Sequence, residues 1–243
     1  REIGYLYGQY KRLRQFDAGV LTGKSLGFGG SLIRPEATGY GLVYFTDNML
    51  AANGKSFKDQ TVLISGSGNV AQYAVQKATE LGAKVISVSD SNGYIIDETG
   101  IDFDLLVDIK EKRRARLTEY AAEKPTAKYF EGSVWNYDGK ADIALPCATQ
   151  NEINGEQAAA LVKNGVYCVA EGANMPSDLD AIKVYKENGV LYGLAKAANA
   201  GGVAVSALEM SQNSLRLSWT REEVDGRLKD IMANIFNTAK ETA

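Results

Sequence analysis

The sequence predicts an α/β fold in which a mostly parallel sheet is doubly wound, with helices on both faces. Three observations support this fold class. Short apolar runs rich in branched residues alternate with helical stretches between Thr61 and Gly193, as in βαβ units. A glycine-rich turn joins the first apolar run to the helix after it. Polar residues follow strand after strand at the carboxyl end, where such sheets bind ligands.

The composition excludes several functional classes. The 243 residues carry a formal net charge of −3, which gives no reason to expect nucleic acid or an acidic membrane as a partner. No apolar run approaches the ~20 residues of a membrane span, and the first residues lack a signal-peptide pattern. We therefore expect a cytoplasmic protein.

Missing residue types restrict the chemistry further. The chain has no histidine, which removes Ser-His and Cys-His catalysis, histidine bases and most zinc sites. We expect no metal site. Its two cysteines, Cys147 and Cys168, do not form a Cys-x-x-Cys pair and should be free thiols in apolar strands.

The first 33 residues differ in pattern from the rest. Ile3, Leu6, Tyr7 and Tyr10 share a helical face with no capping residue before them, so we expect a piece of a longer protein. The glycine-rich loop over residues 22–31 is either a surface connector or the backbone-lined wall of a pocket.

A helix of about fifteen residues is expected next, starting near Pro35 and ending near Asn53. Pro35 suits the first helical turn, and Glu36 is favourable at the positive end of the helix dipole. This helix leads the chain into the glycine-rich turn.

The strongest ligand signal is a strand, glycine turn, helix and second strand within thirty residues. Gly66 permits the tight turn, Gly68 lets the backbone approach a pyrophosphate, and Ala71 stands where helix and strand pack closely. The second strand, over residues 84–89, ends at Asp90, where dinucleotide-binding folds place an acid on the adenine ribose. The stretch predicts a Rossmann-like dinucleotide site. S-adenosylmethionine, or glycines that only tighten packing, are the alternatives.

A turn and short strand over residues 91–97 should precede a helix over residues 102–123. That helix carries a basic run from Lys110 to Arg116. A solvated helix face is the usual role of such a run. Lys110 and Arg113, however, share a helical face, and beside the end of the second strand they could hold an adenosine 2′-phosphate.

The later elements alternate as the fold class requires. We expect strands over residues 142–145, 166–170 and 190–193, and helices over residues 156–164, 178–188, 203–217 and 222–240. Ser177 or Asp178 should cap the second of these helices, and Thr220 with Glu223 should form a capping box before the last. Polar clusters follow five strands, at residues 67–69, 89–91, 149–151, 171–174 and 196–199. Five clusters at one edge of a sheet indicate one cofactor trough.

Five motifs in order carry a family resemblance. They are Arg34-Pro-Glu-Ala-Thr-Gly-Tyr-Gly, Gly66-Ser-Gly-Asn-Val-Ala, Leu145-Pro-Cys-Ala-Thr-Gln-Asn, Ala170-Glu-Gly-Ala-Asn-Met-Pro and Lys196-Ala-Ala-Asn-Ala-Gly-Gly-Val. Together they resemble glutamate dehydrogenase of the small-subunit, typically hexameric kind, over essentially the whole chain. The resemblance implies reversible conversion of L-glutamate, NAD(P) and water to 2-oxoglutarate, ammonia and NAD(P)H, by a full-length homohexamer active in amino-acid metabolism and nitrogen assimilation.

The resemblance also implies site residues. The implied cofactor-binding residues are Arg34, Thr38, Gly66, Ser67, Gly68, Asn69, Val70, Asp90, Ser91, Lys110, Arg113, Ala148, Thr149, Gln150, Asn174 and Asn199. Among them Thr38 and Asn69 would orient the nicotinamide. Thr22, Val203 and Ser206 would touch the substrate, Ser206 by bonding its distal carboxylate.

The family's catalytic lysines and aspartate belong to an N-terminal substrate domain, ahead of Arg1. We therefore expect residues 1–33 to be a helix and glycine-rich linker from that domain, and residues 34–243 to be the dinucleotide-binding domain. Lys24 and Lys196 match no catalytic position, so the chain alone should bind cofactor without useful turnover.

The cofactor depends on two opposed arguments. Asp90 alone favours NAD, because a carboxylate repels a 2′-phosphate. The triplet of residues 89–91 resembles the NADP-using branch, in which Ser91 and distant cations receive the phosphate. Those cations would be Lys110 and Arg113, with Arg116 as a further candidate. We expect NADP, with NAD or dual use as the alternative.

Two other functions stay open. A related leucine or phenylalanine dehydrogenase would lack a polar contact for a distal carboxylate, so Ser206 would matter little. A non-catalytic dinucleotide-binding module would have no substrate domain at all.

Overall fold

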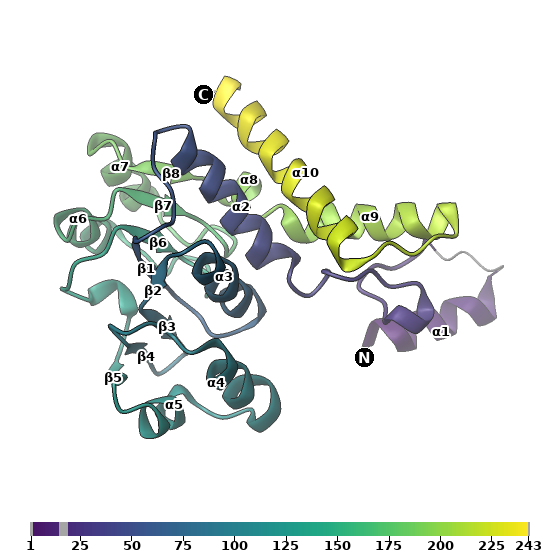
Figure 1. Ribbon diagram of the computed structural model, residues 1–243, viewed down its shortest axis with the longest axis horizontal. Helices are drawn as coiled ribbons and strands as arrows, with labels where there is room; N and C mark the ends of the chain where they lie inside the picture. The colour runs from purple at the N-terminus through teal and green to yellow at the C-terminus, as the bar shows by residue number, and fades with distance from the viewer. Residues whose placement is uncertain (1, 15–18, 243) are drawn as a thin grey trace.

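A five-stranded parallel sheet forms the centre of the computed structural model, which describes residues 2–14 and 19–242 (Figure 1). Its strands are β1 (Thr61–Ile64), β2 (Lys84–Val85), β6 (Ile143–Leu145), β7 (Cys168–Ala170) and β8 (Leu191–Gly193). They lie in the order β2-β1-β6-β7-β8, and every pairing is parallel. This topology confirms the predicted fold class.

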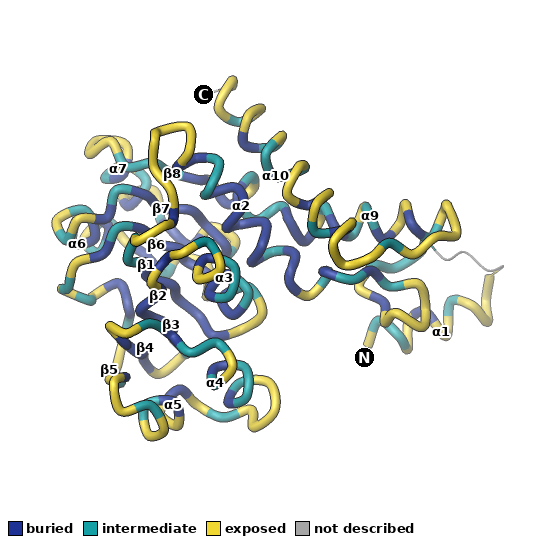
Figure 2. Tube along the Cα trace, in the orientation of Figure 1, coloured by how far each residue is buried: buried dark blue, intermediate teal, exposed yellow. Residues whose placement is uncertain are grey.

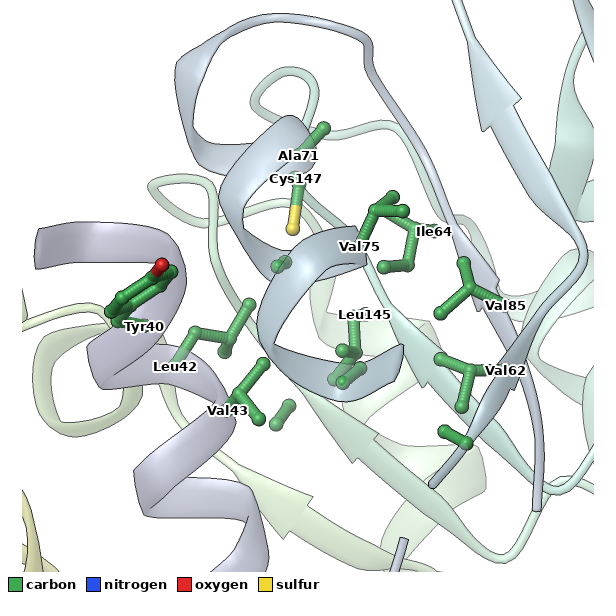
Figure 3. Close-up of a cluster of buried hydrophobic side chains, with 14 of the residues drawn as sticks. Tyr40, Leu42, Val43, Val62, Ile64, Ala71, Val75, Val85, Leu145 and Cys147 are labelled. Carbon is green, nitrogen blue, oxygen red and sulfur yellow. The ribbon is translucent and has the colours of Figure 1, made fainter. Parts of the chain in front are cut away.

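Helices cover both faces of this sheet. The helices α2 (Ala37–Ala51) and α3 (Asn69–Glu80) lie on one face, and α6 (Gly155–Lys163) and α7 (Leu179–Glu187) lie on the other. Val62 and Ile64 pack beneath α2 and α3, as Figure 3 shows, whereas Leu63 between them packs with α6 and α7. Strands buried on both faces explain why the strand sequences are apolar without alternation.

The strand predicted over residues 84–89 divides between two sheets. Its first part is β2, and its second part is β3 (Ser87–Ser89), which pairs antiparallel with β4 (Gly93–Ile96) and, through it, β5 (Lys128–Glu131). The Ser87 hydroxyl accepts from the Ile64 amide at 2.8 Å and donates to the Ile64 carbonyl at 3.0 Å. A side chain therefore replaces part of the ladder to β1, which leaves the β3 backbone available to β4.

The single helix predicted over residues 102–123 is wrong. The structure has α4 (Phe103–Val107), a π-helical turn η2 (Asp108–Arg113) and α5 (Leu117–Glu123). Arg114 adopts a left-handed backbone with φ 55°. The Lys110 ammonium donates to the Ala115 carbonyl at 2.9 Å, so a side chain binds a backbone group that a continuous helix would have bound.

The described residues form further helices and helical turns. They are α1 (Glu2–Leu13), η1 (Leu26–Phe28), η3 (Val134–Asn136), α8 (Ala195–Ala198), α9 (Gly201–Leu215) and α10 (Arg221–Thr242). Helix α9 runs away from the sheet toward α1 (Figure 1). There the Asn213 amide donates to the Gly29 carbonyl at 2.8 Å, and the Tyr7 and Phe28 rings lie 6.1 Å apart.

Helix α1 is mostly exposed or half-buried. Of the predicted α1 face, Tyr7 is buried whereas Leu6 is exposed, and this end of the molecule shows more exposed chain than α2 does (Figure 2).

The side chain that caps α7 is Asp178. Thr220 and Glu223 bond each other's backbone amides, which confirms the capping box. Within the described residues, no helix is long and apolar enough to cross a membrane.

Candidate functional site

Two adjoining cavities lie at the carboxyl ends of the parallel strands. The α2 cavity, of about 520 Å³, is lined by Arg34, Thr38, Val70, Cys147, Ala148, Thr149, Gln150, Gly172, Ala173, Asn174, Asn199, Gly202 and Val203. The glycine-turn cavity, of about 680 Å³, is lined by Gly66, Ser67, Gly68, Ser89, Asp90, Ser91, Lys110, Glu111, Gly132, Ser133, Val134, Cys147, Ala148, Thr149 and Glu152. Residues 147–149 border both, so the two cavities form one trough.

The structure brings most of the predicted site residues together in this trough. Among the described residues named as candidates, Thr22, Asn69, Arg113, Arg116 and Ser206 lie outside both linings. The Asn69 amide donates to the Pro35 carbonyl at 2.7 Å, which ties the start of α3 to the start of α2. Thr22 lies shortly before η1, and Ser206 lies in α9.

The two glycines of the turn, Gly66 and Gly68, differ in why a side chain is absent there. Gly66 has φ 82°, a left-handed conformation, and a Cβ there would lie 3.0 Å from the Cys147 carbonyl oxygen. Gly68 has an extended backbone, and a Cβ there would meet no atom within 4 Å. Gly66 is therefore needed by the fold, whereas the missing side chain of Gly68 leaves open space. No side chain caps α3 at Gly68, so its first N–H groups stay available to an anion.

Asp90 organises the loop after β3. Its carboxylate accepts from the amides of Asn92 at 2.9 Å, Gly93 at 3.3 Å and Leu117 at 3.1 Å. Burial opposes ionisation, but these amides and the nearby Arg116 outweigh burial and lower the pKa of Asp90 below its ordinary value. The charge of Asp90 is thus held largely by its own loop and by the start of α5.

The cations of the basic run have separate partners. Lys110 lines the glycine-turn cavity, and the Arg116 guanidinium donates to the Ser91 hydroxyl at 2.7 Å. Arg113 instead forms ion pairs with Asp108, at 2.7 Å, and with Glu123. The structure therefore brings Lys110, Arg116 and Ser91 together, and it directs Arg113 to carboxylates.

Amide side chains organise the α2 cavity. The Asn199 amide donates to the Asn174 side-chain oxygen at 2.8 Å, and both line the cavity beside Thr38. A Cβ on Gly202 would lie 2.5 Å from the Thr38 hydroxyl, and one on Gly172 would lie 2.7 Å from the Cys147 sulfur. A side chain at either glycine would therefore clash with a residue that lines the cavity.

The start of α9 joins this cavity to the glycine-rich loop. Val203 lines the cavity and is 75 % exposed. Three residues further along, the Ser206 hydroxyl accepts from the Arg34 guanidinium at 3.0 Å. One more turn along, Glu209 accepts from the Gly23 amide at 2.9 Å and from the Lys24 ammonium at 2.8 Å. The turn that holds Thr22 is thereby fixed to α9.

Glu152 is a site residue that the sequence reasoning missed. It accepts from the amides of Ala148 at 3.1 Å and Thr149 at 3.2 Å, and from the Trp135 indole at 2.8 Å. Burial raises its pKa, although the hydrogen bonds to it, one from Ser65 among them, oppose that rise. The only signal in the sequence is an acid directly after the polar cluster at residues 149–151.

The two cysteines lie in the interior of the protein. Cys147 and Cys168 are both free and buried, as the sequence predicts. Burial raises the pKa of both thiols, and Glu152 adds to the rise at Cys147. Among residues 2–14 and 19–242, no group of three or more cysteine or carboxylate side chains could hold a metal ion.

Known proteins resemble this chain over its whole length. The sequence model of the glutamate/leucine/phenylalanine/valine dehydrogenase family matches residues 29–243. An NADP-specific glutamate dehydrogenase of Giardia intestinalis is 54 % identical over 248 residues, which cover 100 % of this chain and 55 % of that protein. An NAD(P)-specific glutamate dehydrogenase of Xylanibacter ruminicola is 58 % identical over 239 residues, which cover 97 % and 53 %.

A solved structure shows the same arrangement. The crystal structure of Plasmodium falciparum glutamate dehydrogenase superposes with a TM-score of 0.96 at 50 % identity, covering 100 % of this chain and 52 % of that one. The chain thus spans about half the length of the curated relatives it matches.

Proposed function

The chain belongs to the glutamate/leucine/phenylalanine/valine dehydrogenase family, and we propose that it is the dinucleotide-binding part of an NADP-dependent glutamate dehydrogenase. The whole enzyme would convert L-glutamate, NADP and water reversibly to 2-oxoglutarate, ammonia and NADPH. The observation that carries the proposal is the continuous trough at the strand ends, with an uncapped helix start at one cavity and paired amides in the other.

The residues present fit a nicotinamide dinucleotide. The open space at Gly68 and the free N–H groups of α3 suit a pyrophosphate. The hydroxyl of Thr38 and the amides of Asn174 and Asn199 suit a carboxamide, which needs both donors and acceptors. The nicotinamide supplies a hydride acceptor. The chain's own residues bind it, orient it and enclose it against residues 147–149.

NADP is the proposed cofactor because the phosphate site has the necessary donors. Lys110 lines the glycine-turn cavity together with Ser91, and Arg116 bonds Ser91 directly. The Asp90 carboxylate accepts hydrogen bonds from the backbone amides of Asn92 and Leu117. These bonds reduce its repulsion of a 2′-phosphate. The names of relatives, NADP-specific and NAD(P)-specific, agree with this choice.

Glutamate is the proposed substrate, and Thr22, Val203 and Ser206 are its proposed contacts in this chain. Arg34 orients the Ser206 hydroxyl, which leaves that hydroxyl free to donate to a carboxylate. The catalytic lysines and aspartate would come from a preceding substrate domain, of which residues 1–33 form the end, while residues 34–243 form the dinucleotide domain. The full-length protein would be a homohexamer.

Calorimetric titration of the chain with NADP and NAD tests this proposal. NADP should bind more tightly than NAD, and the chain alone should not reduce NADP with glutamate. Lys110→Ala and Arg116→Ala should each weaken NADP about tenfold, because each removes a charge-assisted contact to the phosphate. NAD binding should change little.

Arg113→Ala is the matched control in the same basic run. Its partners are carboxylates, so we expect little effect on NADP. If NADP binds no better than NAD, or if Arg113→Ala weakens NADP more than Lys110→Ala does, the proposed phosphate site is wrong. In the full-length enzyme, an unchanged Michaelis constant for glutamate in Ser206→Ala would favour a leucine- or phenylalanine-type dehydrogenase.

A further inference from the structure

A half-buried carboxylate stands at the junction of the two cavities. Glu152 lines the glycine-turn cavity, which also contains the uncapped start of α3. An acid in a cavity suited to phosphates would ordinarily repel the ligand. Here the carboxylate faces the protein: one oxygen accepts from the amides of Ala148 and Thr149, and the other accepts from the Trp135 indole.

The two amides belong to the backbone that divides the trough. Ala148 and Thr149 border both cavities, and they follow Pro146, beyond the end of β6. The segment therefore lies outside the ladder of the sheet, and Glu152 supplies hydrogen-bond acceptors that the sheet does not. The Cys147 amide donates to the Ser65 hydroxyl at 2.9 Å, and that hydroxyl also bonds the Glu152 carboxylate.

We infer that Glu152 is a positioning residue for the cofactor: its carboxylate holds residues 148–149 in the conformation that receives the nicotinamide half of the dinucleotide. The inference rests on the proposed function. An ionised carboxylate has only acceptors, so it satisfies the two amides on one side and the indole on the other. A glutamine cannot do both, because its NH₂ group would face either the two amides or the indole N–H.

This difference in donors provides the test. Glu152→Gln should weaken NADP about tenfold or more, because either the two backbone amides or the indole N–H then faces an NH₂ group in place of an acceptor. Adenosine 2′,5′-bisphosphate, which lacks the nicotinamide half, should bind within about twofold of the wild-type affinity. A purely structural role would weaken both ligands alike.

Rescue distinguishes positioning from general damage. Trp135→Phe removes the indole donor, so Glu152→Gln combined with Trp135→Phe can turn its oxygen to the two amides and place its NH₂ group toward the ring. The double variant should bind NADP more tightly than Glu152→Gln alone. Glu156→Gln, an exposed acid in the first turn of α6, is the matched control and should bind both ligands as the wild type does.

The measurements are calorimetric titrations of the chain with both ligands, together with thermal midpoints for each variant. If Glu152→Gln does not fold, Glu152→Asp takes its place, since the shorter acid cannot reach both partners and should also weaken NADP selectively. Equal loss for both ligands, no loss, or no recovery in the double variant would each overturn the inference. A wild-type chain that binds no NADP would overturn the proposed function itself.

Discussion

The glycine turn and the turn at Thr22, both proposed to face a ligand, are held in place in two different ways. The glycine turn is held within its own βαβ unit: the Gly66 amide donates to the Ser89 hydroxyl at 2.7 Å, 23 residues away. The turn at Thr22 is held by a buried ion pair between Lys24 and Glu209, 185 residues apart.

The stability of the two segments should respond differently when a single contact is lost. The glycine turn belongs to a βαβ unit whose backbone bonds and apolar core remain when one side chain changes. Lys24 and Glu209 have no solvent-exposed side-chain surface, so either partner left alone is a buried, uncompensated charge. Apart from Gly66, whose left-handed backbone the fold requires, the first segment should lose little stability and more binding when one residue changes. The second should show the reverse.

The largest expected effect is at the ion pair. Glu209→Ala should reduce the free energy of unfolding by about 3–5 kcal/mol, because it leaves the Lys24 ammonium buried without its carboxylate. Urea unfolding followed by circular dichroism measures this loss. At urea concentrations below the variant's unfolding midpoint, it should still bind NADP, since Lys24 and Glu209 line neither cavity of the trough.

Glu222→Ala, at an exposed position in the first turn of α10, is the control and should change the unfolding free energy by no more than about 0.5 kcal/mol. Equal losses in the two variants would show that the buried pair contributes nothing particular. Loss of NADP binding in a folded Glu209→Ala chain would show that the two regions are coupled, and the comparison would fail.

An intermediate effect should separate the two glycines of the turn. Gly68→Ala should leave the free energy of unfolding within about 1 kcal/mol, because its backbone is extended and its Cβ meets open space. The same change should weaken NADP about tenfold or more, because the methyl group occupies space proposed for the pyrophosphate. Paired calorimetric titration and urea unfolding measure the two quantities.

Gly66→Ala should behave differently. A non-glycine residue at φ 82° costs about 1–3 kcal/mol in backbone strain, and the added Cβ crowds the Cys147 carbonyl. Stability should therefore fall together with binding. Unchanged NADP affinity in Gly68→Ala would mean that the pyrophosphate does not lie on this turn.

The smallest expected effect is a pH dependence at Asp90. Its pKa in the folded chain is below the ordinary value of 3.8, so its stabilising effect is present above that ordinary value. The effect is lost as pH falls through the lower folded pKa. At about pH 6, Asp90→Asn should lower the unfolding free energy by at most about 1 kcal/mol, since solvent screens the group.

Urea unfolding at about pH 6 and about pH 3 checks this sign, and the difference between wild type and Asp90→Asn should shrink at the lower pH. A difference that grows on acidification would contradict the contacts assigned to Asp90. Such a result would also weaken the view that the glycine-turn region tolerates single changes in its fold.

Most of the fold could be predicted because its signals are local. The strand before Gly66 and the helix after Gly68 are each set by apolar pattern and turn chemistry within a few residues. The capping box at Thr220 and Glu223 is equally local. The break at Arg114 was missed, because it depends on Lys110 bonding the Ala115 carbonyl, a choice that helical periodicity does not reveal.

The sequence predicted most residues of the candidate site, but it did not predict their hydrogen-bond and ion-pair partners. Polar residues at strand ends identified the trough, since parallel strands end at the same edge of a sheet. The partners of these residues could not be predicted in the same way. Arg113 and Arg116 look equivalent in the sequence, yet Arg113 binds Glu123 and Arg116 binds Ser91. Glu152 was missed because its donors belong to a loop and to an indole 17 residues away.

The sequence by itself determined the parallel sheet, the glycine turn and the family motifs, because hydrophobic periodicity and the backbone freedom of Gly66 are properties of neighbouring residues. Only the tertiary structure decided which polar groups meet. It divided β2 from β3 through the Ser87 hydroxyl and buried Lys24 against Glu209. A buried polar group must find a partner wherever the fold brings one, and that partner can be distant in the chain.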